Sequence, residues 1–459
     1  MFQQFIDRSD ELKILEERYK SNKPEFLIIY GRRRIGKTEL VLKFIKNKPN
    51  IYFLAEEKRD IENRNEMQSI MGNFLNDDEF KLIKFDNWTS LFKSFLKRTK
   101  KRTIIVIDEF PYLIKQNPAV PSEFQKIWDL SLSKSNMILI LIGSSISMME
   151  KLLGEKSPLH GRRTGQLEIN PINIFEIKKF LPMYKIEDCI NVYGCVDCIP
   201  LYLKQFRGSL SFYENVKNIF LNRDKLLYSE AEILLRQEFR ETANYFSILK
   251  AISFGYTRHS EIVSYTDLDK TIISKYIQNL EKVRIIKREY PVTERKEKRK
   301  NARYIFTDNY FRFWFRFIYP NKTIIERGEA EQAIKILKQN YNSYLGLIFE
   351  EVVKEFLWRT KPFQFQKIGR WWYKDKEIDL VMLNEQTKDI AFFECKWKKL
   401  GYQQCLKILE ELQEKASFVE WFNEKRKEHY GIIAKKIENK EDLRKKDYLI
   451  YDLDDWDIK

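Results

Sequence analysis

The sequence is poor in the features that mark secreted, membrane-spanning or disordered proteins. Its 459 residues include only 5 cysteines, 15 glycines and 12 prolines, while 14% of the residues are aromatic. The longest fully apolar run, Met137 to Ile142, is far too short to span a bilayer. Residues 1–8 carry no apolar signal-peptide core. These absences argue against long disorder and predict a cytoplasmic protein with no membrane partner.

Cysteine and histidine are also too scattered to form an evident metal or catalytic cluster. Cys195 and Cys198 have a spacing compatible with zinc, and Cys189 is nearby, but no second pair or histidine lies at ligand spacing. We therefore expect reduced, partly buried thiols. The three histidines are far apart: His160, His259 and His429.

Basic residues outnumber acidic ones. The chain has 83 Lys and Arg against 67 Asp and Glu, which gives a net charge of +16 and a pI near 9.2. This balance favours an anionic partner, most simply DNA. The length predicts about two to four domains, and 43% hydrophobic residues suffice to fill their cores.

A complete phosphate-binding loop lies near the start of the chain. Residues 31–38 match G-x-x-x-x-G-K-T, between an apolar run, 26–30, and an amphipathic stretch, 39–45. This is the strand–loop–helix context that the motif requires. Lys37 is expected to reach the β- and γ-phosphates of ATP, and the Thr38 hydroxyl to bind Mg²⁺. The expected nucleotide-binding residues are Gly31, Arg32, Arg33, Arg34, Ile35, Gly36, Lys37 and Thr38.

Two further strand ends complete this expected site. The β-branched run 103–107 ends in Asp108 and Glu109. Asp108 is expected to hold Mg²⁺ and Glu109 to act as the general base for the attacking water. The run 137–142 leads to Ser144, which either senses the γ-phosphate or its water, or only caps the strand end.

Four regions differ in pattern and define the expected domains. Residues 1–165 alternate strands and helices, which is typical of a parallel α/β nucleotide-binding core. Residues 166–235 are expected to form a helical lid. Residues 236–320 form a third region and residues 321–459 a fourth, mixed α/β unit. The aromatic segment 310–319 is expected to be a buried joining helix with snorkelling arginines, rather than a surface on which bases stack.

The third region has the pattern of a winged helix-turn-helix. Helices are expected at 245–252, 259–263 and from Asp269 onward, followed by a hairpin of 285–290 with 302–306. The hairpin tip, 293–300, is strongly basic. Polar residues on the third helix are expected to face a major groove: Lys270, Ser274, Lys275 and Gln278. The alternative is a winged helix that contacts protein, with a solvated tip.

The fourth region contains a second constellation of charged residues. Strands are expected at 377–383 and 389–397, joined as a hairpin. Glu394 and Lys396 then share one face of a strand, and Asp379 of the neighbouring strand can lie beside them. Two such carboxylates suit Mg²⁺, and the lysine can position a water against a phosphate. Glu350, on the preceding helix, is a further candidate ligand. The alternative is a surface Lys–Glu ladder.

Residues 1 to about 320 resemble the archaeal-type P-loop ATPases of the STAND branch, within the wider AAA+ group. The similarity lies in five segments: 5–8, 31–38, 107–110, 143–145 and 159–164. The resemblance implies an ATPase core, a helical lid and a winged helix. It also implies that Arg162 or Arg163 touches the γ-phosphate of the chain's own ATP, or of a neighbour's in a homo-oligomer. The family's Gly-Gly-x-Pro lid motif is reduced here to Pro200.

Residues 340–400 resemble the PD-(D/E)xK nuclease superfamily, with Glu350, Asp379, Glu394 and Lys396 at the expected positions. The resemblance implies a nuclease-like α/β domain at the C-terminus, with Asp379 and Glu394 as metal ligands. Two functions follow as hypotheses. The first is an ATPase that couples nucleotide state to DNA binding and DNA cleavage. The second is a STAND-type regulatory switch whose C-terminal domain only binds.

Overall fold

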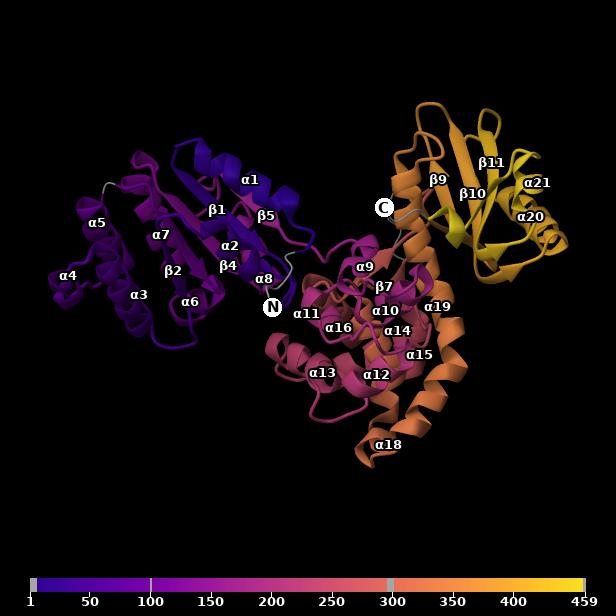
Figure 1. Ribbon diagram of the computed structural model, residues 1–459, viewed down its shortest axis with the longest axis horizontal. Helices are drawn as coiled ribbons and strands as arrows, with labels where there is room; N and C mark the ends of the chain where they lie inside the picture. Colours follow the sequence, from indigo (N-terminus) through magenta and orange to yellow (C-terminus); the bar gives the residue numbers. More distant parts are fainter. Residues whose placement is uncertain (1–5, 100, 295–300, 457–459) are drawn as a thin grey trace. The chain divides into compact units, whose positions relative to one another are not determined.

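The computed structural model describes residues 6–99, 101–294 and 301–456 (Figure 1). The chain divides into two compact units. The first comprises Met1–Ile172 with Ile199–Leu201, and the second comprises Asn173–Cys198 with Tyr202–Lys459. In the described part of the chain, no helix combines the length and the apolar character needed to cross a membrane.

The first unit is built on a fully parallel five-stranded sheet of order β2-β3-β4-β1-β5. This confirms the expected parallel sheet of a P-loop core. β5 lies within the stretch expected to begin the helical lid; its short, half-exposed sequence gives no apolar signal. The strands are β1 Glu25–Tyr30, β2 Asn50–Leu54, β3 Ile104–Asp108, β4 Ile138–Gly143 and β5 Gly165–Glu168.

Helices cover both faces of this sheet, because alternate residues of each strand point to opposite sides. Leu27 and Ile29 pack with α1 and α2 on one face, whereas Phe26 and Ile28 pack with α3 to α8 on the other. The helices are α1 Ser9–Lys20, α2 Lys37–Ile45, α3 Asp60–Leu75, α4 Asp78–Leu82, α5 Trp88–Arg98, α6 Phe110–Gln116, α7 Val120–Leu130 and α8 Ile146–Leu153.

The second unit begins with short helices, as expected for the region after residue 166. They are α9 Ile177–Phe180, α10 Ile186–Val196, α12 Phe212–Phe220 and α13 Leu226–Glu238, and α11 spans Pro200–Leu203 across the unit boundary. Cys189, Cys195 and Cys198 are buried in this region, and burial raises the pKa of the Cys189 thiol to about 12. All five cysteines are buried, so the expectation of partly buried thiols understated their burial.

Residues 243–306 form three helices and a two-stranded antiparallel hairpin, as the pattern predicts. The elements are α14 Ala243–Ser253, α15 His259–Thr266, α16 Lys270–Lys282, β6 Ile286–Glu289 and β7 Arg303–Phe306. The Asp269 side chain caps α16 by accepting hydrogen bonds from the Thr271 and Ile272 N–H groups. Most of the basic hairpin tip, residues 295–300, lies outside the described residues.

A buried aromatic segment connects this region to a long helix. α17 Asn309–Phe313 continues into a π-helical turn at Trp314–Ile318, then α18 Lys322–Glu326 and α19 Ala330–Thr360. The prediction that Arg312 snorkels to the surface is wrong. Its side chain is buried and forms a 2.7 Å ion pair with Glu351 of α19.

The C-terminal part is a five-stranded mixed sheet of order β12-β11-β10-β9-β8. α19 packs against β10, and α20 packs against β10 and β11. β9 and β10 form the expected antiparallel hairpin. The elements are β8 Lys367–Tyr373, β9 Lys376–Leu383, β10 Asp389–Leu400, α20 Tyr402–Ala416, β11 Lys427–Ile437, α21 Lys440–Arg444 and β12 Leu449–Asp452.

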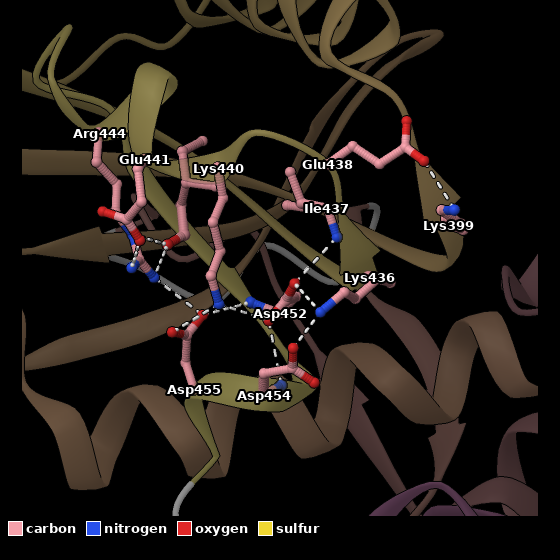
Figure 2. A network of polar contacts seen from close by, with 11 residues as sticks. Lys399, Lys436, Ile437, Glu438, Lys440, Glu441, Arg444, Asp452, Asp454 and Asp455 are labelled. Atoms are coloured by element: carbon pink, nitrogen blue, oxygen red, sulfur yellow. Dashed lines mark hydrogen bonds and ion pairs between the residues drawn. The ribbon is translucent and has the colours of Figure 1, made fainter.

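Figure 2 shows a polar network at the end of β12. The fully buried Asp452 accepts the Ile437 N–H at 3.0 Å and pairs with Lys440 at 2.8 Å. Lys440 also contacts Asp455 at 2.9 Å, and Arg444 pairs with Asp455 at 2.9 Å. The network ties the last strand to α21 and to the end of β11.

Candidate functional site: a nucleotide pocket and a carboxylate–lysine cluster

The phosphate loop joins β1 to α2, and its two glycines are required by its shape. Gly36 caps α2 with a φ of 90°, and Gly31 has a φ of 151°. A Cβ on Gly31 would lie 2.2 Å from the Ile169 carbonyl oxygen. Both positions therefore favour glycine. The N-terminus of α2 directs its N–H groups and dipole towards this loop, which suits a phosphate.

Lys37 lies at the first position of α2 and is buried. Its ammonium donates to the carbonyl oxygens of Gly31 at 2.9 Å and of Arg32 at 2.6 Å. Burial lowers the pKa of Lys37 to about 8, although Glu109 and Asp108 nearby favour its charged form. A buried ammonium with neutral acceptors is suited to meeting a phosphate oxygen.

Thr38 and Asp108 meet where β3 ends beside the loop. The Thr38 hydroxyl donates to Asp108 Oδ2 at 2.6 Å, and the Tyr52 hydroxyl donates to the same oxygen at 2.8 Å. These hard oxygen atoms match the ligands that Mg²⁺ prefers. Tyr52, on β2, was not predicted as a site residue. Parallel pairing of β2 with β3 brings the Tyr52 and Asp108 side chains together.

Glu109 follows β3 in a left-handed backbone conformation, with a φ of 52°. Such a conformation in a non-glycine residue is sparsely populated and is concentrated at functional sites. The Ser144 hydroxyl, after β4, donates to Glu109 Oε2 at 2.9 Å. The two residues therefore lie together beside Asp108, whose Oδ1 accepts the Glu109 N–H at 2.8 Å.

The arginines near this site have several roles. Arg8 donates to the carbonyl oxygens of Ile35, at 3.2 Å, and Asn170, at 2.6 Å, and so ties the loop to the segment after β5. Arg162 contacts Asp129 at 3.4 Å, and Arg163 donates to the Leu153 carbonyl at 3.0 Å. Within the described residues, no hydrogen bond or ion pair joins Arg162 or Arg163 to residues 31–38.

The C-terminal sheet brings the predicted carboxylates and lysine together. Phe393 of β10 is paired with Leu380 of β9, so Glu394 and Asp379 are the next pair in that register. The Lys396 ammonium lies 3.1 Å from Asp379 Oδ2 and also contacts Glu394. The Cys395 N–H anchors Asp379 Oδ2 at 2.8 Å. The three charged side chains form one cluster beside the buried central strand β10.

The charged groups of this cluster strongly affect one another's pKa values. Burial, and then Asp379, raise the pKa of Glu394. Burial alone would lower the pKa of Lys396, but Asp379 and Glu394 outweigh it and raise this pKa. Lys415 of α20 also contacts Glu394 Oε1, at 2.7 Å. A half-buried Lys–Glu–Lys arrangement of this kind differs from the exposed ladder considered as the alternative.

Glu350 is engaged elsewhere. It lies on α19 and forms an ion pair with Arg370 of β8. Burial raises the pKa of Glu350 to about 8, against the opposing effect of Arg370. Among the described residues, no group of three or more His, Cys, Asp or Glu side chains is arranged to hold a metal. The cluster thus offers two carboxylates as ligands, with Glu350 apart in its own pair.

Comparison with known proteins gives two family matches along the chain. Residues 5–206 match a family described as an ATPase domain predominantly from Archaea, and residues 314–408 match a family described as "Archaea bacterial proteins of unknown function". The chain is 41% identical over 458 residues to "Uncharacterized protein MJECL04" of Methanocaldococcus jannaschii, covering 98% of this chain and 100% of that protein. It is also 50% identical over 44 residues to "Uncharacterized ATP-binding protein MJ0423" of the same organism, covering 10% of this chain and 75% of that protein.

Two solved structures give partial matches to the chain. The Walker-type ATPase PABY2304 of Pyrococcus abyssi aligns with 68% of this chain and 96% of its own, at 22% identity and a TM-score of 0.48. The Aeropyrum pernix ORC2 protein aligns with 71% of this chain and 96% of its own, at 12% identity and a TM-score of 0.45. Given the sequence match along its length, the chain belongs to the same family as the M. jannaschii protein MJECL04, with an archaeal-type P-loop ATPase domain followed by a C-terminal region of a family of unknown function.

Proposed function

We propose that this protein binds ATP with Mg²⁺ at the phosphate loop and hydrolyses it. The observation that carries the proposal is the meeting of the buried Lys37 ammonium, the Thr38–Asp108 hydrogen bond and Glu109 in one place. Lys37 holds phosphate oxygens, and Thr38 and Asp108 hold Mg²⁺, which supplies charge stabilisation when it is bound. Glu109 accepts the proton of the attacking water, and Ser144 holds the Glu109 carboxylate in position.

Lys37→Ala is the direct test of this nucleotide site. The variant is expected to lose ATP binding and turnover, because a charge-assisted contact to phosphate is removed. Lys46→Ala, which alters an exposed lysine at the end of the same helix, is the matched control. Equal turnover in the Lys37→Ala variant and in this control would contradict the site assignment.

We further propose that DNA is the anionic partner of the winged-helix region. Lys270, Lys275 and Gln278 are exposed on α16, whereas Ser274 is turned to His259 at 3.0 Å. Replacing Lys270 and Lys275 by Ser should weaken duplex DNA binding and flatten its salt dependence. Replacing Lys335 and Lys338 of α19 by Ser controls for the change in net charge. An unchanged salt slope would leave a protein-contacting winged helix as the better account.

The carboxylate–lysine cluster supports a second activity, metal-dependent DNA cleavage. Asp379 and Glu394 provide oxygen ligands, and Lys396 lies between them where it can hold a water or a scissile phosphate. The lysine contacts of Glu394 fit a site in which a cation replaces an ammonium group. Under the rival hypothesis, a regulatory switch whose C-terminal domain only binds, the same residues serve structure alone.

A plasmid-nicking assay with Mg²⁺ or Mn²⁺ separates these two hypotheses. Asp379→Ala and Lys396→Ala should each abolish cleavage without reducing ATP turnover. Asp375→Ala, an exposed carboxylate in the turn before β9, controls for contaminating nucleases. If all preparations nick DNA equally, or none does, cleavage by this cluster is rejected and the binding-only switch is preferred.

A further inference from the structure

The Asp108 carboxylate accepts hydrogen bonds from three groups that come from different parts of the first unit. Its Oδ1 accepts the Glu109 N–H at 2.8 Å. Its Oδ2 accepts two hydroxyls, that of Thr38 at 2.6 Å and that of Tyr52 at 2.8 Å. Thr38 and Glu109 already have roles in the proposed hydrolysis, whereas Tyr52 has none. The Tyr52 hydroxyl therefore lies at the proposed metal site without an assigned task.

The pairing of β2 with β3 places Tyr52 at this oxygen. Tyr52 is the register partner of Val106, and Asp108 follows Val106 by two residues, so the three side chains point to the same face of the sheet. α2, which begins beside Thr38, covers that face. The half-buried Tyr52 ring packs against the same hydrophobic cluster as Val106. Packing thus fixes the ring, and its hydroxyl reaches Asp108 from an outer strand of the sheet.

The hydrogen bonds leave Asp108 with little free acceptor capacity. An ionised carboxylate has about four lone-pair positions, about two on each oxygen. The two hydroxyls take up those of Oδ2, and the Glu109 N–H takes up one of those on Oδ1. The remaining position is on Oδ1. Without the Tyr52 hydroxyl, Oδ2 regains an acceptor position, and the carboxylate can turn about its last torsion, whose preference is broad.

The number of oxygens that a carboxylate can offer affects which divalent cation it suits. Mg²⁺ requires near-octahedral geometry, keeps several waters and is usually held through one or two carboxylates. Ca²⁺ accepts about six to eight oxygen ligands and often takes both oxygens of one carboxylate. A carboxylate with one oxygen already occupied by two hydroxyls therefore suits Mg²⁺ better than Ca²⁺.

We propose that Tyr52 is a positioning residue that restricts Asp108 to contact through one oxygen and thereby favours Mg²⁺ over Ca²⁺ at the nucleotide site. The inference rests on the proposed ATP site and adds a determinant of the cation that this site accepts. Thr38 supplies the other hydroxyl, but its oxygen is itself an expected metal ligand, so Tyr52 is the donor dedicated to Asp108. Tyr52 acts through Asp108 and takes no part in proton transfer.

Calorimetric titration of the full chain with a non-hydrolysable ATP analogue, in Mg²⁺, in Ca²⁺ and in EDTA, tests this proposal. For each protein, the gain in affinity that Mg²⁺ provides is divided by the gain that Ca²⁺ provides. Tyr52→Phe should lower this ratio about tenfold, as loss of a hydrogen bond to a charged group does. Tyr52→Leu should lower it equally, although it also removes ring packing and should melt earlier. Tyr19→Phe should keep the wild-type ratio, because the Tyr19 ring packs with Phe44 in the same cluster.

The outcomes separate the role of Tyr52 from the ATP site itself. An unchanged ratio in Tyr52→Phe, or a wild-type protein without preference for Mg²⁺, would overturn the role of Tyr52 while leaving the ATP site in place. A ratio that falls in Tyr52→Leu but not in Tyr52→Phe would also overturn it, because the ring and not the hydroxyl would then be responsible. If the wild-type protein binds no analogue with either cation, the ATP site is rejected, and the role of Tyr52 with it.

Discussion

The hydroxyl of Thr38 lies 2.6 Å from the carboxylate of Asp108, so the start of α2 and the end of β3 meet at a single hydrogen bond. The two residues are 70 positions apart in the chain. The parallel sheet brings them together because β1 and β3 both border β4, with their carboxyl ends at the same edge. The contact identifies the point at which Mg²⁺ is expected beside the phosphates.

Asp108→Asn should remove the gain in ATP affinity that Mg²⁺ provides. The amide can still accept from Thr38, but it lacks the negative charge that the cation requires. We expect a loss of about tenfold in affinity with Mg²⁺ and little change in EDTA. Asp86→Asn, at an exposed position, is the control. A full Mg²⁺ effect in Asp108→Asn would place the metal ligand elsewhere.

Nucleotide binding should take up a proton in alkaline solution. The pKa of Lys37 is about 8 in the free protein, and a phosphate beside the ammonium must raise it. At about pH 9 nearly all Lys37 side chains are neutral before nucleotide binds, so binding should take up about 0.9 proton per site. At pH 7 the uptake should be about 0.1 proton per site. Calorimetry in buffers of different ionisation enthalpy measures this number. Uptake that does not increase with pH would mean that Lys37 is already charged throughout.

Glu109→Gln should separate ATP binding from hydrolysis. The amide can keep the contact with Ser144 but cannot accept a proton from water. Turnover should fall by about 10²-fold or more, with ATP affinity within about threefold of wild type. Glu79→Gln, on an exposed face of α4, is the matched variant. Normal hydrolysis by Glu109→Gln would show that another group is the base.

Arg370→Ala should destabilise the second unit in a pH-dependent way. The folded state holds a proton on Glu350 more tightly than the unfolded state does, with a pKa of about 8 against 4.5. The contribution of Glu350 to the free energy of unfolding is therefore complete below about pH 4.5 and is lost as pH rises through 8. Without Arg370 the charged form of Glu350 is costlier still, so the loss should grow as pH rises above about 8, where Glu350 is charged in the wild type, towards about 3 kcal/mol.

Thermal melting at about pH 5 and about pH 9.5 checks the effect of Arg370→Ala. The melting temperature should fall more at the higher pH, and adding Glu350→Gln should recover much of it. Lys374→Ala, in the exposed turn after β8, controls for the lost positive charge. An equal deficit at both pH values would show that packing of the arginine, rather than its charge, is what matters.

Asp452→Ala should loosen the end of the C-terminal sheet. Its carboxylate is fully buried and pairs with Lys440, so its removal leaves the Ile437 N–H without its acceptor and the Lys440 ammonium with Asp455 as its remaining partner. The cost is expected to be about 3 kcal/mol, seen as earlier unfolding in thermal melts and faster hydrogen exchange in β11 and β12. Asp454→Ala, whose side chain is exposed, should melt close to wild type.

The sequence was sufficient to predict the strands of the nucleotide site because their signal is local. The runs that became β1, β3 and β4 are continuous and apolar, and they end at the residues that meet in the pocket. β5 was not predicted because Gly165–Glu168 has no apolar pattern. This segment is a strand because it pairs with β1.

Side-chain partners that come from distant elements could not be predicted in this way. Glu394 and Lys396 share a strand face, and that periodicity was enough to predict their proximity. The contact of Lys415 with Glu394 depends on how α20 packs across β10, and no local spacing encodes it. Likewise, a charged residue on β8 and another on α19 gave no sign that Arg370 and Glu350 would pair.

The Val292 N–H donates to the Arg370 carbonyl of β8 at 2.9 Å, and this hydrogen bond bears on the solubility of fragments. β8 is an outer strand of its sheet, and the segment after β6 covers part of its free backbone, with Val292 packed 3.3 Å from the position of a Gly369 Cβ. A fragment that begins after the winged-helix region would leave this row of N–H and C=O groups bare. Exposed strands of this kind pair with copies of themselves, so such a fragment should self-associate through this edge more strongly than the full chain.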